Sequence, residues 1–487
     1  MFTLKDRDLN ARIGSLKIRG KKIETPYLFP VINPFQTELE PKEIQKVGFK
    51  ALITNAYILF KKKFNDNVHK LLDCEIVMTD SGGYQILEYK EIDVTNREIV
   101  EYQIKIDTDI GVFLDVPTGI SNYERAKETV EETIKRAKEA KEIIDKIRLW
   151  AYPIQGGIYK DLVKYSAEKG KELDFDVYAL GSPTVLMTEY NYLPVFENLA
   201  LVRKIIEFDK PLHLFGAGHS HLLPFAIALG ADLFDSASYI LFARDERYMT
   251  SERTYSLKEL DYFPCNCTVC SKYEPKELLE MNKKERTKLL ALHNLYVLKK
   301  ELNAAKQAIR EGRFWEYLVQ KSYSHPKLRE AFEKIAEQKV FKGYLFKPKQ
   351  KALFLFSSFD LKNPKVSLAK ERAKNLWKAE KNVLLLPYHI FKEEKEKLEK
   401  FIDRSYEIYL YSPYFGIIKE SIAYSFPFFQ SETNKNFDEN LIENLSKEIN
   451  EFIKLNFNKK IKIIIPKGLK LKIKRERNVQ IIYFKFS

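Results

Sequence analysis

Eight short apolar runs, each ending in small or polar residues, recur between residues 25 and 238. Most are separated by stretches with apolar residues at helical spacing, such as residues 124–146 and 193–207. The runs cover residues 25–34, 50–57, 74–83, 110–119, 147–157, 176–183, 211–218 and 232–238. Strands that alternate with helices predict a parallel α/β fold, either a TIM barrel or a doubly wound sheet. The barrel is favoured because polar and glycine residues follow every run, as they do at the catalytic end of such barrels.

The pattern changes after the eighth run. Residues 276–310 and 314–338 are charged, rich in leucine and alanine, and helical in spacing, and mixed α/β composition resumes near Lys342. We therefore expect a barrel domain at residues 1–335 with a helical subdomain at about 262–335, and then two small α+β domains at residues 336–404 and 405–487. Near the end of the last domain, Lys and Arg alternate with Ile and Leu, which predicts a strand pair with one basic face.

Positive charge is concentrated toward the C-terminus. The 487-residue chain carries a net charge of +14, and residues 331–487, with 32 Lys and Arg against 19 Asp and Glu, contribute +13 of it. A near-neutral body with a basic tail predicts a polyanionic partner, most simply nucleic acid, while a solvated lysine-rich surface is the competing interpretation. The first residues lack an apolar signal segment and no uncharged run of about 18 residues occurs, so we expect a cytoplasmic protein without a membrane span.

Three aspartates stand at the ends of expected strands, namely Asp80, Asp115 and Asp235. In a barrel the strand ends meet at one mouth, where one carboxylate could attack a carbon while another moves a proton to and from the leaving group. That is the chemistry of glycosyl transfer with retention. Each aspartate taken alone could equally be a helix N-cap, but three at matched strand ends favour a catalytic set. Next to Asp80, residues 81–83 (Ser-Gly-Gly) would let a flat ligand approach the backbone, and Tyr84 would offer a stacking face.

A metal-binding pattern follows the barrel. Cys265, Cys267 and Cys270 are closely spaced, and His293 follows Cys270 after 22 intervening residues, in a helical stretch. Three thiolates and one imidazole predict a closed tetrahedral zinc site, which would attach the helical subdomain to the barrel rather than do chemistry.

A different metal chemistry is suggested by His219 and His221 in the segment GAGHSH. Two histidines at this spacing could belong to a metal-dependent barrel hydrolase, which would need further ligands from other strand ends. Among the eight strand ends only this stretch, which also holds His213, supplies histidines, so two histidines at the start of a helix are the favoured interpretation.

Several motifs together resemble the tRNA-guanine transglycosylases. They are DSGGYQ at 80–85, PIQGG at 153–157, LGSP at 180–183, HLFGAG at 213–218, LFDSASY at 233–239 and the C-x-C-x2-C…H pattern. The resemblance covers roughly residues 1–335. The segments TNAYIL, PVINP, FLDVPTG and DSASYILFARDERYMT are similar to the archaeal branch, and residues 410–432 resemble the second C-terminal domain of archaeal members.

The resemblance implies an enzyme of archaeosine biosynthesis that exchanges guanine at position 15, in the D-arm of tRNA, for 7-cyano-7-deazaguanine. It implies that Asp235 is the nucleophile of a covalent tRNA–enzyme intermediate and that Asp80 is the general acid/base. The residues implied to bind the base are Asp115, Gln155, Gly181 and Ser182 at its edge, and Tyr84 and Phe215 on its faces. The target nucleotide must leave its stack. Family members dimerise, and Zn²⁺ is the expected cofactor.

The chain departs from the archaeal pattern in one respect, since residues 433–487 contain no recognisable RNA-binding PUA domain. Either the domain is lost or supplied by a separate PUA-containing protein, or it has diverged beyond recognition, and the basic segment at residues 459–477 would partly substitute for it by binding phosphates. The expected RNA contacts are Arg244, Arg247, Lys470, Lys472, Lys474, Arg475 and Arg477. Two alternatives stay open: an archaeosine synthase-like paralogue within the family and, from a different functional class, a non-catalytic tRNA-binding subunit. Intact carboxylates at 80 and 235 speak against both.

Overall fold

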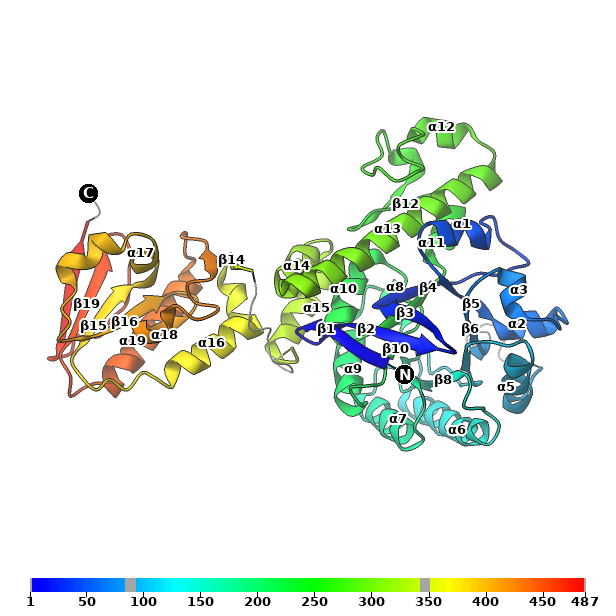
Figure 1. Cartoon of the computed structure of the whole chain (residues 1–487), viewed down its shortest axis with the longest axis horizontal. Coiled ribbons are helices and arrows are strands. Elements are labelled where there is room, and N and C mark those ends of the chain that lie inside the picture. Colours follow the sequence, from blue (N-terminus) through cyan, green and yellow to red (C-terminus); the bar gives the residue numbers. More distant parts are fainter. Residues whose placement is uncertain (1, 84–92, 342–350, 486–487) are drawn as a thin grey trace. The chain divides into compact units, whose positions relative to one another are not determined.

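The computed structural model describes residues 2–83, 93–341 and 351–485. The chain forms two compact units, Met1–Tyr344 and Leu345–Ser487 (Figure 1). The first unit ends close to the boundary expected at residue 335. Among the described residues, no helix is both long and apolar enough to span a membrane.

The first unit is built on an eight-stranded parallel sheet in the order β4-β11-β10-β9-β8-β7-β6-β5. Its strands are β4 (Tyr27–Pro30), β5 (Ala51–Asn55), β6 (Ile76–Asp80), β7 (Ile110–Val112), β8 (Leu149–Ile154), β9 (Val177–Leu180), β10 (Leu212–Leu214) and β11 (Leu233–Ser236). Each lies within one of the eight apolar runs. A parallel bridge between Val31 and Ile53 joins the two edge strands, so the sheet closes into the expected TIM barrel rather than a doubly wound sheet.

Helices alternate with these strands and surround the barrel (Figure 1). They are α1 (Pro41–Lys46), α2 (Ala56–Lys61), α3 (Val68–Leu72), α5 (Asn96–Lys105), α6 (Tyr123–Lys141), α7 (Lys160–Glu172), α8 (Thr184–Thr188), α9 (Tyr192–Ile205), α10 (Leu223–Ala228) and α11 (Ser238–Arg244). Helix α6 shows why such segments are helical. Its alanine, valine and isoleucine residues are buried at helical spacing while Lys and Glu face solvent, and the Asn122 side chain caps its first turn.

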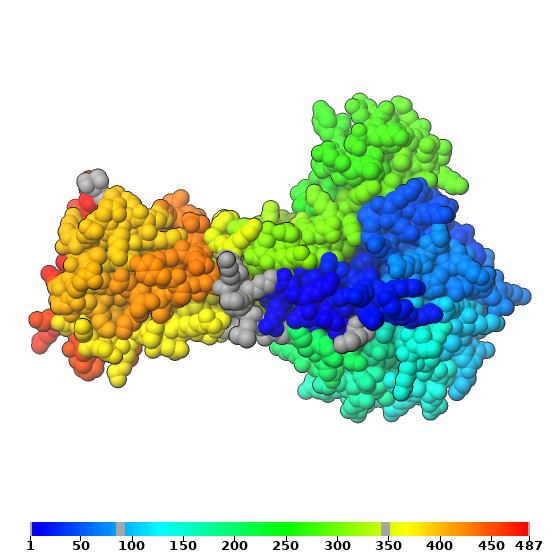
Figure 2. Space-filling view, in the orientation of Figure 1, coloured from blue at the N-terminus to red at the C-terminus, as the bar shows by residue number. Residues whose placement is uncertain are grey.

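A three-stranded antiparallel sheet precedes the barrel, and it was not anticipated from the sequence. It consists of β1 (Phe2–Asp8), β2 (Ala11–Ile18) and β3 (Lys21–Thr25), and it lies at the surface of the first unit (dark blue in Figure 2). Arg12 of β2 forms a buried two-point ion pair with Asp232, in which both N···O distances are 2.6 Å. Because Asp232 directly precedes β11, this pair anchors the sheet at the amino end of the barrel, opposite the strand ends that carry the three aspartates.

The helical subdomain follows β11. It comprises β12 (Arg247–Met249), β13 (Thr254–Ser256), α12 (Pro275–Glu280), α13 (Lys283–Glu311), α14 (Phe314–Ser322) and α15 (Pro326–Glu337), in agreement with the helices expected there. The Asn282 side chain caps the long helix α13, which ends where Gly312 adopts a left-handed conformation with φ 69°.

The second unit contains a five-stranded sheet in the order β17-β16-β15-β19-β20 and a two-stranded sheet, β14-β18. Its elements are β14 (Leu353–Leu355), α16 (Pro364–Lys374), β15 (Val383–Pro387), α17 (Tyr388–Glu393), β16 (Glu407–Ser412), β17 (Gly416–Lys419), α18 (Glu420–Ala423), β18 (Ser431–Thr433), α19 (Glu439–Leu455), β19 (Ile461–Pro466) and β20 (Val479–Phe484).

The expected boundary at residues 404/405 falls between β15 and β16, which are paired neighbours in this sheet. One unit therefore contains both segments that were expected to be separate domains. The expected basic strand pair also differs from the structure. Strands β19 and β20 are parallel, so the chain must travel back between them, and most of the basic residues lie in that connection instead of on a strand.

Candidate active site

The three aspartates gather at the carboxyl end of the barrel. Asp80 is the last residue of β6, Asp235 lies within β11, and Asp115 follows the end of β7 by three residues. The other expected site residues stand at equivalent positions: Gln155 follows β8, Gly181 and Ser182 follow β9, and Phe215 follows β10. Tyr84 lies outside the described residues.

Asp235 is held through one of its two carboxylate oxygens. Its Oδ1 accepts hydrogen bonds from His213 Nε2 at 2.8 Å and from the Gly216 backbone N–H at 3.1 Å. Among the described residues, no hydrogen bond is made to Oδ2, and the side chain keeps 14% of its exposure. The carboxylate is thus fixed in place with one oxygen free to attack.

His213 is a site residue whose role the sequence did not reveal. Its ring is fully buried, stacks on Phe29 at 6.1 Å with an interplanar angle of 10°, and lies 4.7 Å from the ring of the half-buried Phe215. Only its place on β10, next to β11, would have pointed to a contact with Asp235. Residues on neighbouring parallel strands that point to the same side of the barrel are brought together by the fold.

Asp80 is a half-buried acid near other carboxylates. Burial, together with the nearby negative charges of Asp115 and Asp235, raises the pKa of Asp80 from 3.8 to about 7. Hydrogen bonds from the backbone at Ser81 and Gly82 act in the opposite direction. Its Oδ2 accepts a hydrogen bond from Asn55 Nδ2 at 3.1 Å. A carboxyl group with a pKa near neutrality is suited to give and take a proton in successive steps.

Asp115 and Gln155 form the core of a polar network. Gln155 Nε2 donates to Asp115 Oδ2 at 2.6 Å, and Gln155 Oε1 accepts from the Thr118 N–H and the Ser182 hydroxyl, both at 3.0 Å. Burial raises the pKa of Asp115 to about 6, although the hydrogen bond from Gln155 lowers it. A side chain at Gly181 would come within 2.3 Å of Gln155 Nε2, so the glycine is needed for close packing.

Among the described residues, His219 and His221 belong to no group of three or more possible metal ligands. They lie at the short 3-10 helix Ser220–Leu222 that leads into α10, which is the interpretation the sequence favoured. His221 Nε2 is 2.9 Å from the Tyr192 hydroxyl, and burial lowers the pKa of His221 to about 2. Within residues 2–83, 93–341 and 351–485, the single group of three or more possible metal ligands is elsewhere. Nothing in that part of the chain therefore favours a metal-dependent hydrolase.

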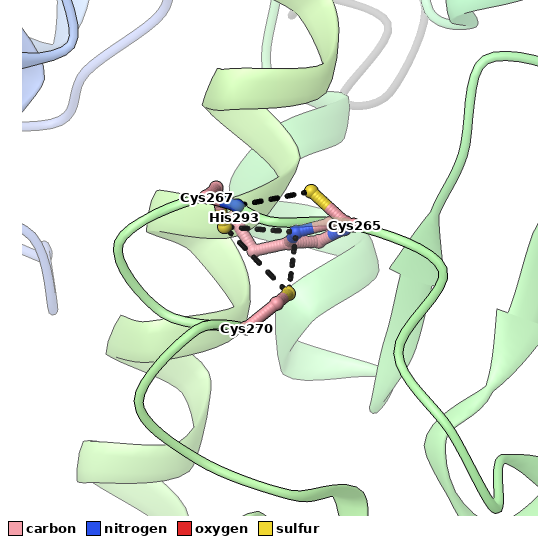
Figure 3. Close-up of side chains that lie close together, drawn as sticks. All are labelled: Cys265, Cys267, Cys270 and His293. Atoms are coloured by element: carbon pink, nitrogen blue, oxygen red, sulfur yellow. Dashed lines mark hydrogen bonds between the residues drawn. The ribbon is translucent and has the colours of Figure 1, made fainter.

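That group is the expected one: Cys265, Cys267, Cys270 and His293, whose ligand atoms all lie within 4.8 Å of one another (Figure 3). His293 Nδ1 is 3.4 Å from Cys267 Sγ and 3.3 Å from Cys270 Sγ. Its Nε2 lies 2.8 Å from the Met249 carbonyl oxygen, which can only accept, so Nε2 carries the proton and Nδ1 presents its lone pair to the sulfurs. This donor set fits a tetrahedral metal ion and links α13 to the segment at residues 265–270, while the hydrogen bond from His293 Nε2 ties α13 to the end of β12.

The residues expected to contact RNA differ in how they are engaged. Arg244 binds Glu38 at 3.0 and 2.8 Å, and this hydrogen-bonded pair lowers the pKa of Glu38. Arg247 lies 4.0 Å from the centre of the Phe242 ring and donates to Thr254. The basic residues expected in the tail, Lys470, Lys472, Lys474, Arg475 and Arg477, are exposed.

Comparison with known proteins identifies relatives of the whole chain. A family model described as queuine tRNA-ribosyltransferase matches residues 6–327. Three similar proteins are named tRNA-guanine(15) transglycosylase. The one from Saccharolobus solfataricus is 46% identical, with 97% of this chain and 98% of that protein aligned. The one from Sulfolobus acidocaldarius is 43% identical over 93% of this chain and 92% of its own length. The one from Thermococcus onnurineus is 43% identical over 90% of this chain and 72% of its own length.

Proposed function

The chain belongs to the queuine tRNA-ribosyltransferase family, and from that premise we propose that it is a tRNA-guanine(15) transglycosylase of archaeosine biosynthesis. It is a transferase that exchanges guanine in tRNA for another base. The observation that carries the proposal is the carboxylate pair: Asp235, fixed through Oδ1 with Oδ2 unengaged among the described residues, and Asp80, with a pKa of about 7, at the same end of the barrel.

In the first half-reaction, Asp235 attacks the anomeric carbon of the ribose, while the bond from that carbon to guanine breaks and Asp80 gives its proton to the departing base. The product is a covalent ester between tRNA and Asp235. In the second half-reaction, Asp80 takes a proton from the incoming base, whose nitrogen bonds to the anomeric carbon as Asp235 leaves. One glycosidic bond replaces another, so no nucleotide hydrolysis is required.

We assign recognition of the base edge to Asp115, Gln155, Gly181 and Ser182, and stacking to Tyr84 and Phe215. The Gln155 amide fixes the orientation of the Asp115 carboxylate at 2.6 Å, which supports its role as acceptor for the N–H groups of a purine. The residues around this network, Val116, Pro117 and Thr118, are short. A compact nitrile therefore fits better than a bulky substituent, and we propose 7-cyano-7-deazaguanine as the incoming base.

We propose that the ion held by the three cysteines and His293 is Zn²⁺, for which thiolate and imidazole ligands in a four-coordinate site are typical. Four protein ligands would leave no position for a reacting water, so the ion has a structural role. We further propose that the protein works in the cytoplasm as a homodimer. We also propose that a separate PUA-containing protein, or the basic tail, provides the tRNA binding that a PUA domain would otherwise provide. Arg244 and Arg247 remain proposed RNA contacts through the N–H donors that their present partners leave unused.

The test is incubation of the protein with unmodified tRNA and labelled guanine or 7-cyano-7-deazaguanine. We expect incorporation at position 15 by the unaltered protein, and none by Asp235→Asn. A covalent tRNA adduct that survives denaturation should form with the unaltered protein and be absent in that variant. Failure of the unaltered protein to incorporate either base would refute the proposal.

A further inference from the structure

The second unit has the topology of a ligand-binding α/β sheet. Strands β16, β15, β19 and β20 are parallel, and β15 lies between β16 and β19. From β15 the chain continues to β16 on one side, and from β19 it continues to β20 on the other. The connections that leave the carboxyl ends of β15 and β19 therefore diverge. In open α/β sheets, such a divergence creates a crevice in which ligands bind.

A cleft of about 600 Å³ lies at this point. Residues that follow β15 and β19 line it, together with the first turns of α19. Its apolar lining includes Phe437, Ile442 and Leu469, and its charged lining consists of three lysines and two glutamates: Lys435, Lys470, Lys472, Glu439 and Glu443. The volume lies in the range of small-ligand sites, and the combination of a flat apolar wall with lysines suits a nucleobase and its phosphate.

The segment that leaves the cleft has alternating burial. Leu469, Leu471 and Ile473 are partly buried against the core of the unit, whereas the residues between them are exposed. We call the exposed set, Lys470, Lys472 and Lys474, the basic strip. Alternate residues of an extended segment are about 6.6 Å apart, which is close to the separation of successive phosphates along a nucleic-acid strand.

Helix α19 holds the backbone of the basic strip in place. The Lys472 N–H donates to Ser446 Oγ at 3.0 Å, and the Lys474 N–H donates to Asn450 Oδ1 at 2.8 Å. Asn450 Nδ2 donates in turn to the Lys472 carbonyl at 2.8 Å. These bonds involve only backbone atoms of the strip, so its lysine side chains are presented in a fixed register without being used to hold the fold.

The cations of this segment form no close ion pair among the described residues, although Lys472, after Lys447, contributes to lowering the pKa of the nearby Glu443. Residues 467–477 contain six Lys and Arg and one Glu. Among the residues that the structure describes, none of those six cations has a carboxylate partner within ion-pair distance, whereas nearby Lys435 and Lys447 pair with Glu393 and Glu443. A fixed row of unpaired cations is expected to attract a polyanion and to release its counterions on binding.

We propose that the cleft and the basic strip form an RNA-binding site of the second unit, which holds a single strand of the substrate tRNA with its phosphates on the strip and one unstacked nucleotide in the cleft. This proposal rests on the proposed function, because that function makes tRNA the polyanion present. A single row of cations matches one strand better than a duplex. Lysines act as point charges, so the strip holds the backbone without reading its sequence.

The first experiment compares two charge-reversed variants of the full chain. The strip variant is K470E/K472E/K474E. The matched control is K378E/K381E/R404E, whose three residues are exposed and precede β15 and β16, at the amino ends of these strands and away from the cleft at their carboxyl ends. Binding of an unmodified tRNA transcript is measured by filter retention between about 50 and about 200 mM salt. Because binding does not require turnover, this measurement can fail or succeed independently of base exchange.

We expect the strip variant to bind roughly tenfold or more weakly at the low-salt end, and the slope of log affinity against log salt to become shallower by about 2, as the loss of three phosphate contacts to a single strand implies. At saturating tRNA its rate of guanine incorporation should equal that of the control. A strip variant with the affinity and slope of the control would overturn the proposal.

The second experiment tests the cleft without changing charge. Ile442→Trp places a bulky indole ring in the cleft, and we expect it to weaken tRNA binding several-fold while the salt slope stays the same. Binding equal to that of the unaltered protein would overturn the placement of a nucleotide in the cleft. Unlabelled single-stranded RNA should displace the tRNA better than duplex RNA of the same length, and equal displacement by the duplex would overturn the assignment to a single strand.

Discussion

His213 Nε2 lies 2.8 Å from Asp235 Oδ1, so the carboxylate that we assign as nucleophile is oriented by a fully buried imidazole on the neighbouring strand. The ring of His213 is held in turn by stacking on Phe29. This contact, together with the N–H of Gly216, leaves Oδ2 of Asp235 as the oxygen that would bond to the ribose.

Removal of the His213 hydrogen bond should slow the chemical step. His213→Phe keeps an aromatic ring against Phe29 but cannot donate to Asp235. A hydrogen bond to a charged group contributes about 1.5–3 kcal/mol, so we expect kcat for guanine exchange to fall roughly 10- to 100-fold, with KM for tRNA unchanged. Single-turnover kinetics measure this, and thermal melting shows whether the variant is folded. His213→Gln, which retains a donor, should recover part of the rate. If it is no faster than His213→Phe in a folded protein, the positioning role is wrong.

The rate of guanine release should depend on the protonation of Asp80. With a pKa of about 7, Asp80 loses its proton as the pH rises through neutrality, so release in the first half-reaction should decline above about pH 7. Asp115→Asn removes one of the negative charges that raise this pKa, and the decline should then begin at lower pH. Single-turnover rates of guanine release, measured across a pH series for the unaltered protein and the variant, show where each decline begins. If the decline begins at the same pH in both proteins, the charge of Asp115 does not raise the pKa of Asp80.

The same carboxyl group should reduce stability at high pH. Its pKa is higher in the folded protein, about 7, than its ordinary value of 3.8, so the folded state binds more protons than the unfolded state between those values. The contribution of this group to the free energy of unfolding is therefore fully present below pH 3.8, and it is lost as the pH rises through about 7. Asp80→Asn removes that effect, and we expect it to melt at a higher temperature than the unaltered protein at pH 8 but not at pH 4. Equal melting temperatures at pH 8 would argue against a raised pKa.

Gly181→Ala should damage the base-binding network without unfolding the barrel. A Cβ at this position would lie 2.3 Å from Gln155 Nε2, so the amide must move away from Asp115. Small misplacements of positioning groups can cost up to about 100-fold, and we expect kcat/KM for the free base to fall at least about tenfold. Because Gln155 is a side chain that can shift, the melting temperature should change little. Steady-state kinetics with labelled guanine test the expected loss of kcat/KM, and thermal melting tests whether the fold is retained.

Chelation of the metal ion that we propose for the cysteine–histidine site should destabilise the first unit rather than stop the chemistry directly. The four ligands link α13 to the segment at residues 265–270, and a loss of about 4 kcal/mol on chelation would lower Tm by roughly 6 °C in a domain of this size. Activity should decline in parallel with folding, and Cys267→Ser should act in the same direction. Loss of activity with an unchanged Tm would show that the ion takes part in the reaction.

Much of the architecture was accessible from local patterns. All eight barrel strands lie within the apolar runs, and α12 to α15 occupy the expected helical region. The N-terminal sheet was missed because its anchor is a contact between residues 220 positions apart, Arg12 and Asp232. The basic tail was misread as a strand pair because alternation of Lys with Ile and Leu describes any extended segment with one buried face, whether or not it pairs with another strand.

The sequence by itself determined which residues could act: aspartates at strand ends, glycines where the backbone must pack closely, and three cysteines with a histidine in metal-binding spacing. Those are local properties, set by residue type and short-range periodicity. Only the tertiary structure decided that His213 orients Asp235, that Gln155 holds Asp115, that Arg244 pairs with Glu38, and that a cleft and a row of free lysines adjoin in the second unit. Each of these contacts depends on the order of the strands and on the path of the connections between them, which bring together side chains that are distant in sequence.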